Sequence, residues 1–110
     1  MDVQQIGGAS VVKLMERVDS ITCQEVDSAL QASIATNPRQ VICECTATKY
    51  ISSAGLRVFL SAAKKLKRTG GQLAIVCAKD NYVYEVLELA GFTRIIPVFD
   101  TVDEALAKLS

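Results

Sequence analysis

Two adjacent hydroxyl side chains, Ser52 and Ser53, are the residues whose type and position best suit chemistry in this chain. They follow an apolar, strand-like run that starts at Val41, and an amphipathic helical pattern begins at Ser53. A serine at such a junction can cap the helix, which contributes about 0.5 to 2 kcal/mol to stability, or it can accept a phosphate. A single N-cap explains only one of the two serines, and the residues by themselves leave capping and phosphorylation equally open.

A phosphate at this junction would act at the surface of the protein. It carries about −1.5 to −2 charges at neutral pH, and a helix N-terminus offers free N–H groups and the positive end of the helix dipole. The fold should therefore tolerate the charge, whereas a partner docked there would have to desolvate it. The junction is suited to a regulatory switch.

The composition argues against an enzyme, a metal protein and a nucleic-acid-binding protein. The 110 residues include no histidine, which excludes a Cys/His zinc site, and they contain no G-x-x-x-x-G-K phosphate cradle. Twelve basic and twelve acidic residues cancel, so no net field favours nucleic acid or an anionic membrane. We predict no catalytic residue, no metal site and no cofactor.

The sequence also predicts a reducing location. The four cysteines, Cys23, Cys43, Cys45 and Cys77, form no C-x-x-C pair, and three of them lie in apolar strand-like runs, so we expect reduced thiols that pack in the core. No run approaches the roughly 18 apolar residues of a spanning helix, and the N-terminus lacks the charged and apolar regions of a signal peptide. We expect a cytoplasmic protein without a membrane partner.

Hydrophobic periodicity and turn signals predict an alternation of strands and helices. Strands are expected at residues 3–6 and 10–18, joined in a hairpin, and at residues 40–46, 72–78 and 94–99, the last at a sheet edge because of Pro97. Besides the serine junction, capping signals at Thr22, Asp80 and Thr101 predict helix starts, with Ile21 and Val26 as a hydrophobic staple. This order predicts an α/β fold: a single-domain, mixed, mostly parallel sheet of about four to five strands covered by about four helices.

The helix that begins at Ser53 has a clear 3.6-residue pattern. Its inward face is predicted to hold Leu56, Phe59, Leu60, Ala63 and Leu66, and in the short last helix Leu106 and Leu109 are expected to point inward. The helix that begins at Ser53 also carries five basic residues, which are expected to form a solvated face that could meet an acidic partner surface. They are Arg57, Lys64, Lys65, Lys67 and Arg68.

The segment Tyr-Ile-Ser-Ser-Ala-Gly-Leu at residues 50–56 resembles the phosphorylation loop of the STAS family (sulfate transporter and anti-sigma factor antagonist). That loop reads roughly Asp-Ser-(Ser/Thr)-Gly-Leu before a long helix. Aligned on Gly55-Leu56, the family's phosphoacceptor serine falls on Ser53, its aspartate on Ser52 and its second hydroxyl on Ala54. The resemblance continues through residues 67–73, 86–92, 96–100 and 104–106, and it implies that residues 1–110 form one STAS domain.

The resemblance to the small anti-sigma factor antagonists of this family implies a function in transcription regulation and no enzymatic activity. Such a protein sequesters an anti-sigma factor while the serine is unphosphorylated. The anti-sigma factor is also a serine kinase of the histidine-kinase-like ATPase fold, its phosphorylation of the serine ends the binding, and a serine phosphatase restores it. The resemblance implies Ser53 as the phosphorylation site, and Asp19, Ser52, Ala54, Gly55 and Arg57 as phosphorylation-loop and partner-binding residues.

Two positions keep alternatives open. Asp19 ends a segment that aligns with the family's Gly-x-(Leu/Ile)-Asp near the phosphorylated serine, with Glu16 in place of the glycine, but it reads equally well as a turn or cap residue before the first helix. The uncharged Ser52, in place of the family's aspartate, supports a second hypothesis. Under that hypothesis the chain is a phosphorylation-independent STAS adaptor or scaffold subunit in a signalling complex.

Overall fold

The computed structural model describes residues 1–109, without the side chain of Leu109. Five strands form a sheet in the order β1-β2-β4-β6-β7. They are β1 (Asp2–Ile6), β2 (Ala9–Lys13), β4 (Gln40–Glu44), β6 (Gln72–Val76) and β7 (Val98–Phe99). β1 runs antiparallel to β2, and the other neighbouring strands are parallel. The predicted α/β fold with a mixed, mostly parallel sheet is confirmed, as is the edge position of the last strand.

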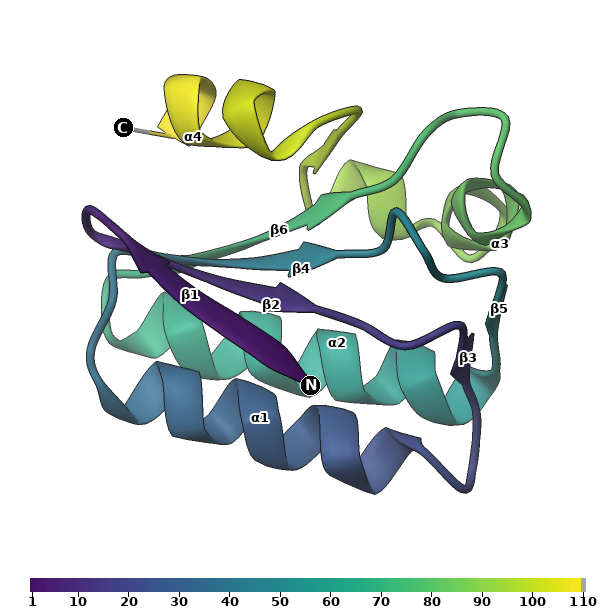
Figure 1. Ribbon diagram of the computed structural model, residues 1–110, viewed down its shortest axis with the longest axis horizontal. Coiled ribbons are helices and arrows are strands. Elements are labelled where there is room, and N and C mark those ends of the chain that lie inside the picture. The colour runs from purple at the N-terminus through teal and green to yellow at the C-terminus, as the bar shows by residue number, and fades with distance from the viewer. Residues whose placement is uncertain (110) are drawn as a thin grey trace.

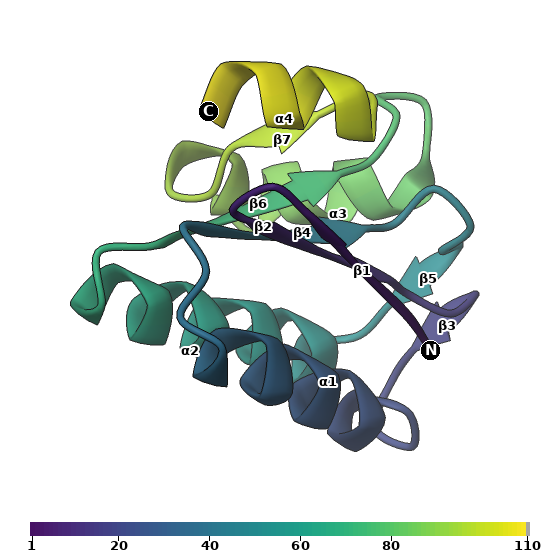
Figure 2. The same cartoon turned by 60° about the vertical axis from the view of Figure 1, so that its left-hand side comes forward.

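Helices lie on both faces of this sheet (Figures 1 and 2). Helices α1 (Cys23–Ala35) and α2 (Ser53–Arg68) lie side by side on one face, and α4 (Val102–Leu109) lies over the other. Helix α3 (Tyr82–Leu89) is followed by the short 3-10 helix η1 (Phe92–Arg94). The main core lies between the sheet and the α1–α2 pair, and a smaller apolar cluster lies under α4. No helix within residues 1–109 is both long and apolar enough to cross a membrane.

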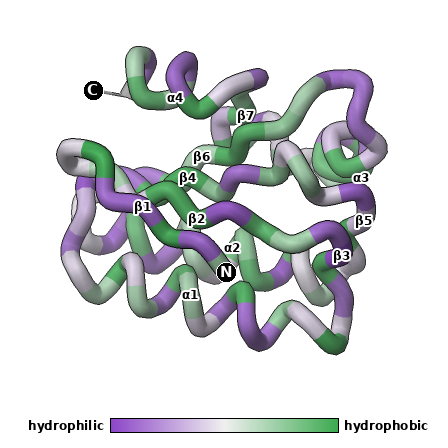
Figure 3. The backbone as a smooth tube through the Cα atoms, viewed as in Figure 1, coloured by the Kyte–Doolittle hydropathy of each residue, from purple (hydrophilic) through white to green (hydrophobic). Residues whose placement is uncertain are grey.

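Helix α2 has the predicted inward face. Phe59 and Leu66 are fully buried, and the side chains of Leu56, Leu60 and Ala63 are half-buried against the same core. The basic residues Arg57, Lys64, Lys65, Lys67 and Arg68 are exposed. Hydrophobic and hydrophilic segments accordingly alternate along α1 and α2 in Figure 3. Burial of Phe59 and of Leu66 contributes about 1.5 to 3 kcal/mol each, which holds this helix in one register on the sheet.

The strand predicted at residues 10–18 is wrong in its second half. β2 ends at Lys13, the chain bends at Glu16, and β3 (Arg17–Val18) pairs with β5 (Tyr50–Ile51) in a separate two-stranded sheet. The Glu16 carbonyl accepts hydrogen bonds from the N–H groups of Lys49 (2.7 Å) and Tyr50 (3.3 Å), which joins the bend to the segment that enters β5. Strands of two residues are too short to show a period of their own.

Two of the predicted helix caps are wrong, because the predicted side chains do not make the cap hydrogen bonds. The two helices nevertheless start close to the predicted residues. The Thr22 hydroxyl makes no cap bond to α1 and instead donates to the Arg17 carbonyl at 2.8 Å. The staple is absent, because the side chain of Ile21 is 86% exposed. At α3 the cap is Asn81, whose side chain accepts from the Val83 N–H at 2.9 Å, and the predicted Asp80 lies one residue too early.

The C-terminal segment also differs from the strand predicted at residues 94–99. The Phe92 carbonyl accepts from the N–H groups of Ile95 (3.0 Å) and Ile96 (2.8 Å), so a turn occupies this region and leaves only Val98–Phe99 as β7. The predicted cap at Thr101 is present, since its hydroxyl accepts from the Glu104 N–H at 3.1 Å. Leu106 is half-buried as expected, and the predicted inward position of the Leu109 side chain lies outside the described residues.

Candidate functional site

The parallel pair β3–β5 brings Asp19 and Ser52 to one edge. Val18 is paired with Ile51, so the residue that follows each strand emerges beside the other, and the Ser52 N–H donates to the Val18 carbonyl at 2.8 Å. Segments 33 residues apart in the sequence thus meet at the N-terminus of α2. The structure places Asp19 in the neighbourhood of the serine junction, which is where the resemblance puts it.

Ser52 occupies the N-cap position of α2 but does not cap it. Its backbone is extended (φ −95°, ψ 174°), as an N-cap requires, and its carbonyl accepts the first helical bond from the Leu56 N–H at 3.0 Å. Its Oγ is buried and has no hydrogen-bond partner among the described residues. A buried hydroxyl without a hydrogen-bond partner costs free energy. Ser52 therefore destabilises the loop at this position.

Ser53 is the first residue of α2, and its side chain is exposed. The N–H groups of Ser53, Ala54 and Gly55 precede the first i-to-i−4 bond, and the first turn contains no acidic residue. The helix dipole therefore presents its positive end to the Ser53 hydroxyl without a carboxylate in that turn to offset it. Of the neighbouring candidates, Ala54 is half-buried and Arg57 is exposed.

Gly55 is buried and cannot offer a side chain to a partner. A Cβ atom at this position would lie 2.7 Å from Val18 Cγ1 and 2.8 Å from Ile51 Cγ1. The glycine allows the first turn of α2 to approach β3 and β5 this closely. Close packing therefore explains the glycine at this position, and the same packing fixes the first turn of α2, which carries Ser53.

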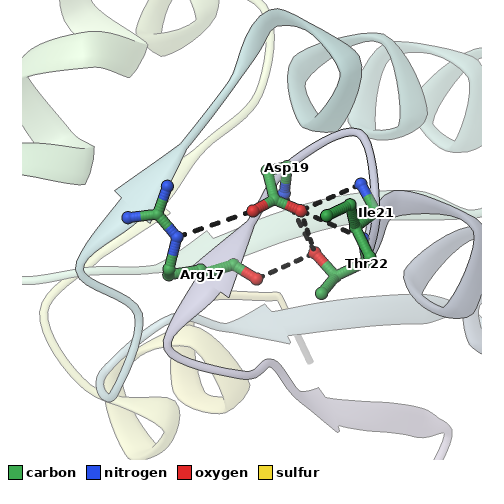
Figure 4. A network of polar contacts seen from close by, with 4 residues as sticks. All are labelled: Arg17, Asp19, Ile21 and Thr22. Carbon is green, nitrogen blue, oxygen red and sulfur yellow. Dashed lines mark hydrogen bonds and ion pairs between the residues drawn. The ribbon is translucent and has the colours of Figure 1, made fainter.

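Asp19 organises the turn that leads into α1 (Figure 4). Its Oδ1 accepts from the N–H groups of Ile21 (3.0 Å) and Thr22 (3.1 Å), and its Oδ2 lies 3.5 Å from Arg17 Nε. Its own N–H donates to Thr22 Oγ1 at 2.9 Å. The hydrogen bonds from the Thr22 and Ile21 backbones hold the pKa of the Asp19 carboxyl below its usual value. Asp19 therefore agrees with both interpretations from the sequence. It is a turn residue before α1, and it also lies next to the serine junction.

Thr48 and Asn81 anchor the loop that leads to β5, and neither is among the site residues predicted from the sequence. Thr48 is fully buried, and its hydroxyl donates to the Met15 carbonyl at 2.9 Å. Asn81 Nδ2 donates to the Thr48 carbonyl at 3.0 Å, while its Oδ1 caps α3. Asn81 is as good an N-cap type as Asp80, so its residue type is a local signal for this cap. Thr48 gives no local signal, because its partner lies 33 residues away.

Three of the four cysteines lie in the core as predicted, and Cys23 lies outside it. Cys43, Cys45 and Cys77 are fully buried and Cys23 is half-buried, and all four are free. Burial raises the pKa of the Cys43 thiol to about 12 and that of Cys77 to about 11, which keeps both neutral. Within the part of the chain that the structure describes, no group of three or more His, Cys, Asp or Glu residues could hold a metal ion.

The fold and the junction together define a small mixed-sheet domain with an exposed serine at the start of a sheet-covering helix. The family model of the STAS domain matches residues 1–105, and the chain belongs to this family. The relative BtrV of Bordetella bronchiseptica, whose name classes it provisionally as an anti-sigma factor antagonist, is 34% identical over 107 residues. The match covers 97% of this chain and 91% of BtrV.

Solved structures show the same fold. The crystal structure of an anti-sigma factor antagonist from Mycobacterium paratuberculosis matches with a TM-score of 0.87 and 24% identity, over 97% of this chain and 90% of that one. The phosphorylated form of SpoIIAA, a Bacillus cell fate determinant, matches with a TM-score of 0.75 and 14% identity, over 99% of this chain and 98% of that one. At these identities the structural likeness shows the fold alone.

Proposed function

We propose that this protein is a regulatory switch of the anti-sigma factor antagonist type. It binds and sequesters an anti-sigma factor while Ser53 is unphosphorylated, and phosphorylation of Ser53 ends the binding. The proposal draws on the named function of the relative that is 34% identical and on the position of Ser53. The protein acts by binding and performs no catalysis of its own.

The observation that carries the proposal is the exposed Ser53 side chain at the first position of α2. A kinase can reach this hydroxyl, and the N-terminal end of the helix stabilises the phosphate that results. The hydrogen-bonded turn at Asp19 and the close packing of Gly55 hold the surrounding backbone in place. The new charge would therefore change what the surface binds while the fold is kept.

The partners follow from the same proposal. The anti-sigma factor is a serine kinase of the histidine-kinase-like ATPase fold, and a serine phosphatase returns the protein to its binding form. Since such a kinase draws on ATP, the exchange takes place in the cytoplasm. The exposed Arg57, one helical turn after Ser53, lies where a docked partner would contact it.

Phosphorylation by the cognate kinase tests the proposal. The protein is incubated with the kinase and ATP, and the phosphate is located by mass mapping of peptides. We expect one phosphate on Ser53, none in a Ser53→Ala variant that still binds the kinase, and normal phosphorylation in the matched Ser52→Ala variant. Phosphate on Ser52 alone would move the switch by one residue.

A second function is favoured by one observation, the uncharged Ser52 where the family pattern has an aspartate. A kinase that requires the carboxylate would leave this chain unmodified. The protein would then be a phosphorylation-independent adaptor or scaffold in a signalling complex. Tight partner binding together with no phosphate on either serine would support this alternative over the switch.

A further inference from the structure

A groove lies at the opposite end of α2 from Ser53. It has a volume of about 500 Å³ and lies between the C-terminal half of α2, the start of β6 and the turn that follows η1. Its apolar surface comes from the half-buried Leu60 and Ala63 and the exposed Ile95, whereas Leu73 and Ile96 border it with only 2% and 1% of their area exposed. Lys64 and Lys67 lie at its α2 side. This volume is in the range of small-molecule sites, which are mostly apolar with a few polar groups.

The two lysines of the groove have uncompensated charges. Within residues 1–109, neither Lys64 nor Lys67 takes part in an ion pair or a side-chain hydrogen bond, whereas the neighbouring Lys65 turns toward α1 and donates to Gln31. Both lysines are exposed, on a chain whose total charge is zero. The groove therefore combines an apolar floor with a local positive rim.

The sheet edge beside the groove is also incomplete. β7 pairs only with Ile75 and Val76, so the start of β6 has no partner strand on that side. The Ile75 N–H donates to the Pro97 carbonyl, and because N–H directions alternate along a strand, the Leu73 N–H points to the same, open side. Ile95, which also lines the groove, keeps a side chain that is 63% exposed. A ligand here could bury apolar surface and meet a backbone donor.

We propose that this groove binds a straight-chain carboxylate of medium length, roughly eight to twelve carbons. The alkyl chain lies along Leu60, Ala63 and Ile95, and the carboxylate meets the ammonium groups of Lys64 and Lys67. Charge complementarity selects an anion, the apolar floor selects an alkyl body, and the volume selects a ligand of this size. Acetate would lack the body, and an alkylammonium ion would meet the wrong charge.

The groove is independent of the serine switch. Lys64 and Lys67 lie 11 and 14 residues after Ser53 on the same helix, which corresponds to roughly 16 to 21 Å along its axis. A ligand in the groove would leave the N-terminal turn of α2 uncovered. The proposal therefore stands or falls separately from phosphorylation.

The test is a titration of the isotope-labelled protein with sodium decanoate, followed by amide chemical shifts. We expect saturable shifts centred on Ala63, Leu73 and Ile95, with a dissociation constant in the submillimolar to millimolar range, and no comparable shifts with acetate or decyltrimethylammonium. Absence of saturable groove shifts at millimolar decanoate would overturn the proposal. Equal binding of decyltrimethylammonium would also overturn it, because the lysines would then have no role.

Charge-matched variants sharpen the test. Lys64→Gln combined with Lys67→Gln should weaken decanoate binding about tenfold or more, since it removes both charged partners of the carboxylate. The control, Lys65→Gln combined with Arg68→Gln, removes the same charge from the same helix and should change the affinity less than about twofold. Ala63→Phe keeps every charge but fills the groove and should abolish binding. Equal weakening by both charge pairs would show a non-specific ionic effect and contradict the assigned site.

Discussion

The two ends of α2 have different surroundings. At the N-terminal end, here called the fastened end, side-chain and backbone hydrogen bonds hold the neighbouring segments together. The C-terminal end, here called the open end, borders the groove. Asp19, Thr22 and Thr48 all use their side chains to hold the backbone near Ser53. Lys64 and Lys67, by contrast, have no described partner of this kind, and the start of β6 beside them lacks a neighbouring strand. The same helix joins a fastened end to an open one.

Under the two proposals, α2 has an anion-binding region at each end, and the physical reason differs between the ends. The N-terminal end attracts negative charge through backbone N–H groups and the dipole, which act on a group attached at a fixed place. The C-terminal end carries Lys65, Lys67 and Arg68 in its last turn, and long basic side chains can follow a diffusible ligand. A rigid, hydrogen-bonded end is suited to a covalent phosphate that a partner protein recognises, and an open groove is suited to reversible binding of a small ligand.

The largest expected effect is that of Gly55→Ala at the fastened end. The added Cβ would lie less than 3 Å from side-chain atoms of Val18 and Ile51, so α2 must shift or its neighbours must repack. We expect a loss of about 1 to 3 kcal/mol in the free energy of unfolding, measured by urea denaturation. Gly8→Ala is the control, because the nearest atom to its Cβ would be Cδ of the flexible Arg39 side chain, at the ordinary contact distance of 3.4 Å. Equal stability of the two variants would show that the first turn of α2 is not closely packed.

The next effect separates Asn81 from its neighbour Asp80. Asn81→Ala removes both the cap of α3 and the bond to the Thr48 carbonyl, and we expect a loss of about 1 to 2 kcal/mol by chemical denaturation. Asp80→Ala, one residue earlier on the exposed surface, should lie within about 0.5 kcal/mol of the unchanged protein. A larger loss of stability for Asp80→Ala than for Asn81→Ala would show that Asp80 is the cap of α3.

The thiols provide a pH test of the core beneath the fastened end. Their folded pKa values, about 12 for Cys43 and about 11 for Cys77, lie above the ordinary value near 8.5. Their contribution to stability is thus present below about pH 8.5 and is lost as the pH rises toward these values. In the native state near pH 8, a thiol reagent should modify Cys23 first, and the three buried cysteines should react only upon unfolding. Rapid native modification of Cys43 or Cys45 would contradict the burial.

A smaller effect is expected from the Asp19 carboxylate. Its folded pKa is lowered, so its contribution is present above the unfolded value of about 3.9 and is lost as the pH falls through the folded pKa. Asp19→Asn should lower the melting temperature at neutral pH by less than Gly55→Ala does, and this difference from the unchanged protein should shrink in acid. A difference that stays constant with pH would show that the charge of Asp19 has no role in the turn.

The regular elements could be predicted because their periods are long enough to be read. The burial of Phe59 and Leu66 and the exposure of Lys64 follow from the 3.6-residue pattern of α2, and β4 and β6 follow from their apolar runs. The position of Ser53 at the start of α2 follows from the change of period at the junction.

The connections between these elements could not be predicted, because distant partners decide them. The Thr22 hydroxyl could cap α1, but it donates its hydrogen bond to the Arg17 carbonyl instead, which the turn at residues 19–22 brings close. β3 and β5 have two residues each and form only through their mutual pairing. The reason for Gly55, and the groove at the other end of α2, likewise depend on residues that are remote in the sequence.

The most direct test of the serine switch compares how the unchanged protein, Ser53→Asp and Ser53→Asn bind the cognate anti-sigma factor in isothermal titration calorimetry. The two variants have nearly the same shape and differ in charge. Because a partner must desolvate the carboxylate, we expect Ser53→Asp to bind about tenfold more weakly or worse, and Ser53→Asn to bind nearly as well as the unchanged protein. Both variants should keep the circular dichroism spectrum and melting temperature of the fold. Binding of Ser53→Asp with unchanged affinity would contradict the account.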